Sequence, residues 1–334
     1  MQGLGGTGKS TIASYLYQKN DFAAKFWADV SLNPDFTIFA EKVITAFGGK
    51  VSQPIDVTQL INDLLALLNQ RRCLLIIDNL ENLIDETRNW QSDYYQQFFS
   101  RWLRQGTTSI ILLTTRDKPQ SFQGLLHWYS LEGMKITEGI SLLKELEIEG
   151  TAEELEDFVR YVDGHPLTID LVAGYLREYC DSQLSQVAEL GLEQFDLAYE
   201  EAKGVHRNQE ARLSWIIQQH LERLTTEQKK FFIDLSVYRL PFDLEAASYI
   251  WLEKDVTSFV INKKLQELCN RSLLIKAQNN QYIFQALVKE YLSQQEKQDL
   301  TIAHQQAVEY YQLYLKEKQS WKVLEDVSEY LEII

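Results

Sequence analysis

A glycine-rich loop within the first ten residues constrains this chain more than any other feature. Residues 3–10 read Gly-Leu-Gly-Gly-Thr-Gly-Lys-Ser and match the pattern G-x-x-x-x-G-K-[S/T] without a gap. Glycines let consecutive backbone N–H groups curve around an anion, and a helix that starts at the loop directs its positive end at the same anion. Lys9 adds a positive charge for phosphate groups, and the Ser10 hydroxyl is a ligand suited to Mg²⁺. The loop therefore predicts a phosphate-binding site.

Segments with strand and helix patterns alternate after the loop. Continuous apolar or aromatic runs predict strands at residues 26–31, 73–78 and 109–116. Helical spacing of apolar residues predicts helices at residues 11–17, 60–68 and 94–103. This alternation is typical of a doubly wound α/β domain with a parallel sheet.

Two polar residues fall at the carboxyl ends of predicted strands, where such sheets bind ligands. Asp78 closes the run at 73–78, as expected of an acid that organises Mg²⁺, although a turn or helix-cap role is the alternative. Arg116 closes the next run, and it either faces the ligand, faces solvent or pairs with an acid. Asn79 follows Asp78 in place of a second acid, and the sequence leaves the direction of Glu81 open.

The pattern changes from about Glu138, after which helices dominate. Gly164-His165-Pro166-Leu167 predicts a helix start with proline in the first turn. Short helices over residues 224–292 precede a predicted β-hairpin, the outline of a winged helix. We expect four regions, namely a nucleotide-binding domain at 1–136, a helical subdomain at 137–210, a winged helix at 211–294 and C-terminal helices at 295–334.

Net charge, cysteine spacing and the lengths of apolar runs exclude several classes of function. The net charge of −15 opposes nucleic-acid binding, because DNA contact would need a local basic patch. The lysine pairs at 229–230 and 263–264 have acids among them, so DNA binding is not expected. The three cysteines are far apart and show neither a disulfide framework nor metal-ligand spacing. With no membrane-length apolar run and no secretory signal pattern, we expect a cytoplasmic protein without a membrane partner.

The order of four motifs resembles a known family. GLGGTGKST, LLIIDNLE, ILLTTRD and GHPL follow one another as in the NB-ARC subgroup of the STAND signal-transduction ATPases, with similarity over residues 3 to about 292. The resemblance is to the bacterial type. It implies a P-loop NTPase sheet, a helical subdomain, a winged helix and C-terminal helices, that is, an α/β plus α fold.

The resemblance also assigns roles to residues. It implies that Lys9 binds phosphates, that Ser10 and Asp78 hold Mg²⁺, with Asp78 as the Walker B acid, and that Arg116 senses the γ-phosphate. Lys9, Asp78 and Arg116 are therefore the expected catalytic residues. The residues expected to contact ATP or ADP are Gly3, Gly5, Gly6, Thr7, Gly8, Lys9, Ser10, Thr11, Pro166 and Gln285. Pro166 would pack against adenine.

Gln285 stands where many relatives have a histidine that contacts the ADP β-phosphate. A glutamine amide can donate a hydrogen bond there but carries no charge, which predicts a weaker ADP-locked state. Because Asn79 cannot serve as a general base, we expect slow ATP hydrolysis.

The implied function is a switch that is closed with ADP and opens or self-associates with ATP. The alternatives are a nucleotide-controlled winged-helix transcription regulator and a scaffold that does not hydrolyse nucleotide.

The family also has a buried strand immediately before the phosphate loop, in the middle of its sheet. Here only Met1 and Gln2 precede Gly3. The expectation is a fragment or a mis-started reading frame, shortened at both ends, with a strand and an effector domain upstream.

Overall fold

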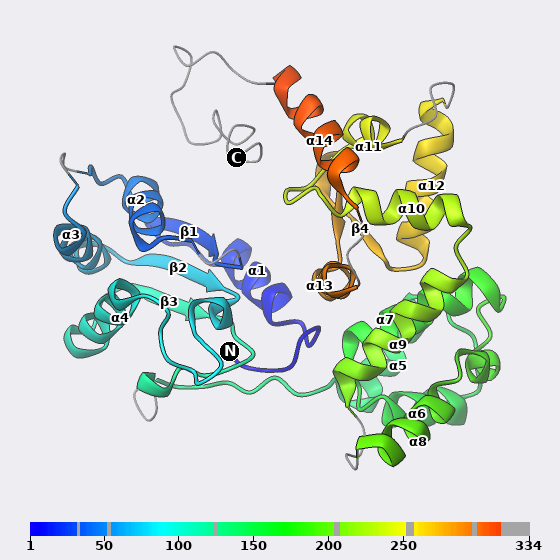
Figure 1. Cartoon of the computed structure of the whole chain (residues 1–334). Helices are drawn as coiled ribbons and strands as arrows, with labels where there is room; N and C mark the ends of the chain where they lie inside the picture. Colours follow the sequence, from blue (N-terminus) through cyan, green and yellow to red (C-terminus); the bar gives the residue numbers. More distant parts are fainter. Residues whose placement is uncertain are drawn as a thin grey trace. The chain divides into compact units, whose positions relative to one another are not determined.

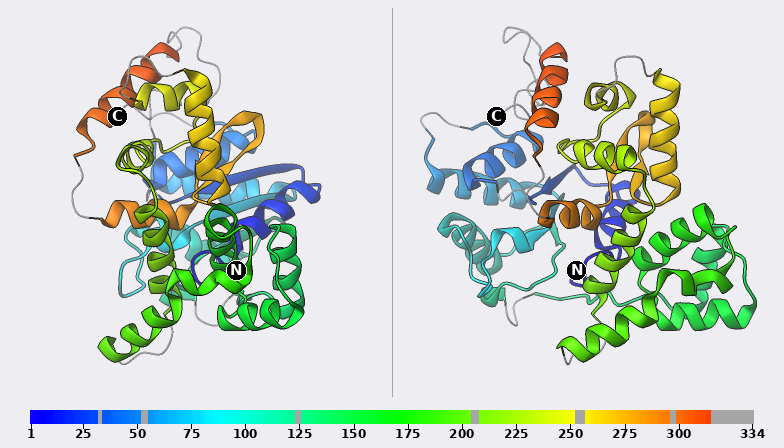
Figure 2. Two further views of the ribbon diagram at one scale, coloured as in Figure 1. Left: turned by 90° about the vertical axis from the view of Figure 1, so that its right-hand side faces the viewer. Right: turned by 45° about the vertical axis from the view of Figure 1, so that its right-hand side comes forward.

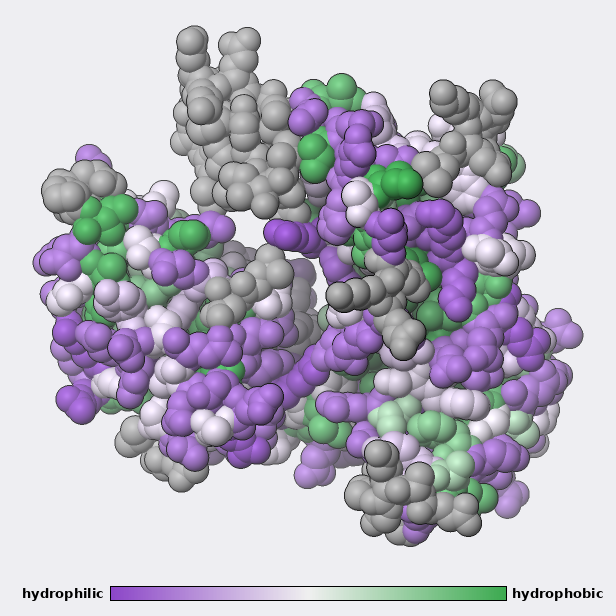
Figure 3. Space-filling model, in the orientation of Figure 1, coloured by the Kyte–Doolittle hydropathy of each residue, from purple (hydrophilic) through white to green (hydrophobic). Residues whose placement is uncertain are grey.

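The computed structural model describes residues 1–31, 34–51, 55–122, 126–203, 208–251, 257–295 and 299–314. The chain forms two compact units, Met1–Gly133 and Met134–Ile334, which are taken in turn (Figure 1). Among the described residues, no helix is both long and apolar enough to cross a membrane. On the face shown in Figure 3, hydrophilic residues predominate over both units.

A three-stranded parallel sheet forms the centre of the first unit. Its strands are β1 (Ala24–Asp29), β2 (Cys73–Asp78) and β3 (Ile110–Leu113), in the order β1-β2-β3. All six residues of β2 are buried, because this strand has a neighbour on each side and helices on both faces. The predicted α/β fold is confirmed, with β1 starting two residues early and β3 shorter than its apolar run.

Alternation along β2 divides its side chains between two faces. Leu74 and Ile76 pack with Ala13 of helix α1 (Lys9–Lys19). Cys73, Leu75 and Ile77 belong to a larger core on the opposite face. The helices that contribute to this larger core are α2 (Phe36–Ala46), α3 (Val57–Gln70) and α4 (Asp93–Gln105).

Met1 and Gln2 lie between the end of β3 and the segment at residues 129–131. Gln2 forms parallel bridges with both Thr115 and Ser130. Its N–H donates to the Tyr129 carbonyl at 2.8 Å, and its carbonyl accepts from Leu131 N–H at 2.7 Å. On the other side, the Thr115 N–H donates to the Met1 carbonyl at 3.1 Å, so the segment that precedes the glycine-rich loop has backbone partners on both sides. This fixes the point at which the loop leaves the sheet.

The described residues of the second unit form helices, one β-hairpin and their connections. Its α-helices are α5 (Ile136–Glu145), α6 (Ala152–Tyr161), α7 (Pro166–Tyr179), α8 (Leu192–Lys203), α9 (Gln209–Glu222), α10 (Thr226–Leu235), α11 (Leu244–Ile250), α12 (Ser258–Asn270), α13 (Ala286–Gln294) and α14 (Thr301–Tyr314). Strands β4 (Leu274–Lys276) and β5 (Tyr282–Phe284) pair antiparallel, and Figure 2 shows α12 beside them. Short 3₁₀ helices occur in both units: η1 (Leu80–Leu83), η2 (Gln120–Phe122), η3 (Leu184–Leu190) and η4 (Gln278–Asn280).

Helix α7 is central to the second unit, since nine of its residues are buried, and it begins with Pro166 as predicted. One hydrophobic core runs from Leu143 to Tyr311. The predicted hairpin is present, whereas the finer division at 137–210, 211–294 and 295–334 stays a prediction. The expected C-terminal helix is seen as α14, and residues 315–334 lie outside the described residues.

Candidate functional site

The glycine-rich loop leaves the sheet at Gly3 and ends where α1 begins. Gly6 and Gly8 have positive φ angles of 77° and 90°, which side chains other than glycine rarely adopt. A Cβ at Gly3 would lie 2.7 Å from the Leu131 carbonyl oxygen, so this position also requires glycine. No side chain caps the start of α1 at Gly8. The first turn of α1 therefore directs its N–H groups and its positive dipole end towards the loop.

The Lys9 side chain folds back inside the loop. Its ammonium group donates to the carbonyls of Gly3 at 2.9 Å and Leu4 at 2.8 Å, and the Thr7 hydroxyl donates to the same Leu4 carbonyl at 2.9 Å. Burial lowers the pKa of Lys9, and the nearby Glu81 carboxylate is the main opposing influence. The ammonium group of Lys9 therefore lies against the inner backbone of the loop.

Asp78 lies beside Ser10 although 68 positions separate them in the sequence. The Ser10 hydroxyl donates to Asp78 Oδ1 at 2.9 Å, and the Thr114 hydroxyl donates to the same oxygen. Asp78 is only 6% exposed. Burial raises the pKa of this carboxyl, while the hydrogen bonds from Thr114 and Ser10 lower it. A hydroxyl and a carboxylate oxygen this close are hard oxygen donors of the kind that Mg²⁺ takes.

Asn79 turns away from this pair. Its backbone is left-handed, with φ of 65°, and its N–H donates to the Thr114 hydroxyl at 3.0 Å. Its side-chain amide donates to Asp29 Oδ1 at the end of β1, also at 3.0 Å. The position after the strand-end acid therefore offers neither a carboxylate nor a side chain facing Ser10.

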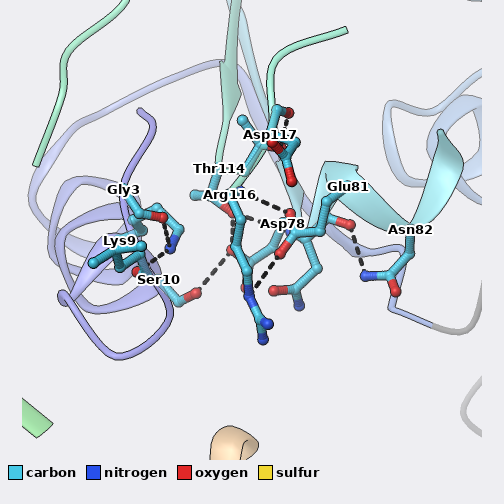
Figure 4. A network of polar contacts seen from close by, with 12 residues as sticks. Gly3, Lys9, Ser10, Asp78, Glu81, Asn82, Thr114, Arg116 and Asp117 are labelled. Atoms are coloured by element: carbon cyan, nitrogen blue, oxygen red, sulfur yellow. Dashed lines mark hydrogen bonds and ion pairs between the residues drawn. The ribbon is translucent and has the colours of Figure 1, made fainter. Parts of the chain in front are cut away.

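Glu81 is directed at Arg116, as Figure 4 shows. One carboxylate oxygen lies 3.4 Å from the Arg116 Nε, and the other accepts from the Arg116 backbone N–H at 3.2 Å. Of the three possibilities left open for Arg116, pairing with an acid is therefore observed. Sequence reasoning did not assign Glu81 a role. Its position three residues after Asp78 did not predict where its side chain points, because the left-handed residue Asn79 lies between them.

Pro166 and Gln285 belong to the second unit. Pro166 starts α7, which the preceding His165 caps by accepting the Thr168 N–H at 3.2 Å. The Gln285 amide donates to Asp170 Oδ2 at 3.4 Å, and the Ser272 hydroxyl donates to Asp170 Oδ1 at 2.8 Å. The expected contacts of Pro166 and Gln285 with a nucleotide stay predictions.

Residues 1–145 match the family described as the NB-ARC domain, a span that holds the loop, Asp78 and Arg116. Residues 1–145 therefore belong to the NB-ARC domain family. The expected family resemblance is thereby confirmed. Two curated relatives are each 24% identical to it. They are an uncharacterized WD repeat-containing protein of Nostoc sp., matched over 87% of this chain, and apoptotic protease-activating factor 1 of Mus musculus, matched over 61%. The chain spans 24% and 17% of the lengths of these two relatives.

A solved structure supports the fold over nearly the whole chain. It is a Signal Transduction ATPase with Numerous Domains (STAND) protein with a tetratricopeptide repeat sensor, from Pyrococcus horikoshii. The similarity has a TM-score of 0.63 at 17% identity and covers 99% of this chain and 45% of that one. Together with the parallel sheet, it shows a P-loop NTPase fold.

Proposed function

We propose that this protein is a nucleotide-dependent signal-transduction switch that binds ATP and ADP with Mg²⁺. The observation that carries the proposal is the hydrogen bond between Ser10 and Asp78 at the mouth of the glycine loop. It brings two oxygen ligands suited to a divalent cation to the start of a helix that favours phosphate.

Each residue of the site has a part in this proposal. Ser10 and Asp78 would hold Mg²⁺, and the bound ion would neutralise phosphate charge. Lys9 exchanges the carbonyls of Gly3 and Leu4 for the β- and γ-phosphates, since a phosphate oxygen is the stronger partner of an ammonium group. The backbone of the loop, from Gly3 to Thr11, surrounds the phosphates. Arg116 contacts the γ-phosphate.

Slow hydrolysis suits a switch, and the geometry around Asn79 supports it. The Asn79 amide is engaged with Asp29, and an amide is a poor acceptor for the proton of an attacking water. We further propose that ADP favours a closed state, with Pro166 against adenine and Gln285 towards phosphate. ATP then favours an open state that self-associates.

The alternative of a DNA-binding winged helix has less support. Lys230 pairs with Asp234 at 2.5 Å, and Lys264 pairs with Glu227 at 3.4 Å and lies over the Trp251 ring. These acids reduce the local positive charge that a phosphate backbone would need. The alternative of a scaffold that does not hydrolyse nucleotide has less support, because Lys9 lies in the loop and Ser10 donates to Asp78, so the residues expected to bind phosphate and Mg²⁺ are all in place.

Nucleotide content tests the proposal. The protein is purified, denatured, and its released ligand is resolved by ion-exchange chromatography, for the parent and for Lys9→Ala. Lys19→Ala, which removes a lysine from the last turn of the same helix, is the matched control. We expect bound ADP or ATP in the parent and in Lys19→Ala, and none in Lys9→Ala. Equal nucleotide in all three proteins, or none in the parent even after incubation with ATP and Mg²⁺, would contradict the proposal.

A further inference from the structure

We propose that Glu81 is a positioning residue that holds Arg116 and competes for it with the γ-phosphate, so that Glu81 lowers the affinity of the site for ATP relative to ADP. The inference rests on the proposed function and deepens it. The observation behind it is that one carboxylate contacts Arg116 twice, at the backbone N–H and at the guanidinium Nε.

The double contact restricts Arg116 at both ends of the side chain. The backbone hydrogen bond fixes where the residue leaves the end of β3, and the ion pair fixes where the guanidinium begins. The Glu81 and Arg116 side chains are 17% and 30% exposed. A pair sheltered to this degree is screened less by water than a surface ion pair.

The local fold fixes the direction of Glu81. Asn79 is left-handed and turns the chain from β2 into η1, where Glu81 lies between the fully buried Leu80 and Leu83. The Leu80 N–H donates to the Thr114 carbonyl at 3.0 Å, which ties this turn to the end of β3. Glu81 therefore faces Arg116 because its backbone is anchored on both sides.

The pair also lies within the electrostatic reach of the phosphate loop. Lys9 is close enough to Glu81, Arg116 and Asp78 for their charges to interact. In Figure 4 the Arg116 side chain is drawn between Ser10 and Glu81. An anion held by the loop and the guanidinium of Arg116 are thus placed to attract each other.

This placement gives the two nucleotides different effects on the pair. A γ-phosphate carries more charge and more acceptor oxygens than a carboxylate, so Arg116 shifts its contact from Glu81 to the γ-phosphate. ATP binding must therefore weaken the Glu81 contact, whereas ADP binding leaves it in place. Glu81 accordingly lowers the affinity for ATP and leaves the affinity for ADP unchanged.

The test measures the ratio of two dissociation constants by titration calorimetry, with Mg²⁺ and either ADP or a non-hydrolysable ATP analogue. The proteins are the parent, Glu81→Gln, Arg116→Ala and the double variant. Glu86→Gln, which removes the same charge from an exposed position five residues further on, is the control. We expect Glu81→Gln to raise the analogue-to-ADP affinity ratio about three- to tenfold, as for the loss of a partly sheltered ion pair. ADP affinity should be unchanged.

The Arg116→Ala protein shows whether Glu81 acts by positioning Arg116 or only by supporting the local structure. There Glu81→Gln should leave the ratio unchanged, because the competed group is gone. An unchanged ratio in the Arg116-containing protein, or an equal change for both nucleotides, would overturn the Glu81 inference while nucleotide binding itself stands. If the parent bound neither ligand, the proposed function would fail as well.

Discussion

Gly174, in the middle of α7, is a position where two physical effects oppose each other. Glycine inside a helix is less favourable than alanine by about 1 kcal/mol, so Gly174→Ala should stabilise an isolated helix. In the folded protein, a Cβ at this position would lie 2.5 Å from the Arg271 carbonyl carbon and 2.6 Å from its oxygen. Real Cβ atoms essentially never approach other atoms within 3.0 Å, so either the helix or the Arg271 backbone would have to move.

The Arg271 turn is held in place by its own hydrogen bonds. The Arg177 guanidinium donates to the Asn270 carbonyl at 2.8 Å, and the Ser272 hydroxyl donates to Asp170 at 2.8 Å. Moving the turn away from α7 would weaken both bonds, at about 1 kcal/mol each, in addition to about 1 to 3 kcal/mol for overpacking. The clash outweighs the gain in helix propensity. We expect Gly174→Ala to lower the free energy of unfolding by about 2 to 4 kcal/mol.

Urea denaturation followed by circular dichroism measures this change. Ser141→Ala, at an exposed position of α5, is the control, and its higher helix propensity should leave the protein equally stable or slightly more stable. If Gly174→Ala were stabilising by about 1 kcal/mol, helix propensity would dominate and the close packing of α7 on the Arg271 turn would be refuted.

Two further predictions concern buried ionisable groups of the second unit. Arg212 is 1% exposed and pairs with Asp196, which also accepts from the Tyr161 hydroxyl at 2.5 Å. Arg212→Met would leave that carboxylate without its cation and should destabilise by about 3 to 5 kcal/mol in urea denaturation, and a loss below 1 kcal/mol would contradict this. His220 is fully buried beside the Leu171 carbonyl at 2.9 Å, and burial lowers its pKa from 6.5 to about 4. The unfolded chain then binds a proton that the folded chain does not, so stability is present above pH 6.5 and is lost as the pH falls towards 4. His220→Gln should flatten this loss in unfolding titrations between pH 7 and 4, and an equally steep loss would argue against His220.

The sequence by itself determined the features that depend only on residues close to one another along the chain. The loop at residues 3–10 is recognisable because glycine, lysine and serine at fixed spacing suffice to surround phosphate. The strand at 73–78 was predicted without error, because a continuous apolar run of that length suits a strand buried on both faces. The helix that starts at Pro166 was predicted because proline is tolerated in the first turn.

Only the tertiary structure decided which distant side chains meet. Ser10 and Asp78 were each predicted, but their contact depends on the parallel register that carries the end of β2 to the start of α1. The directions of Asn79 and Glu81 follow from a left-handed turn whose conformation no spacing rule fixes. Gln285 was assigned from the family pattern to a nucleotide, and the fold gives it Asp170 as a protein partner. The physical reason is common to these cases, because local patterns fix backbone conformation whereas side-chain partners depend on packing between segments far apart in the chain.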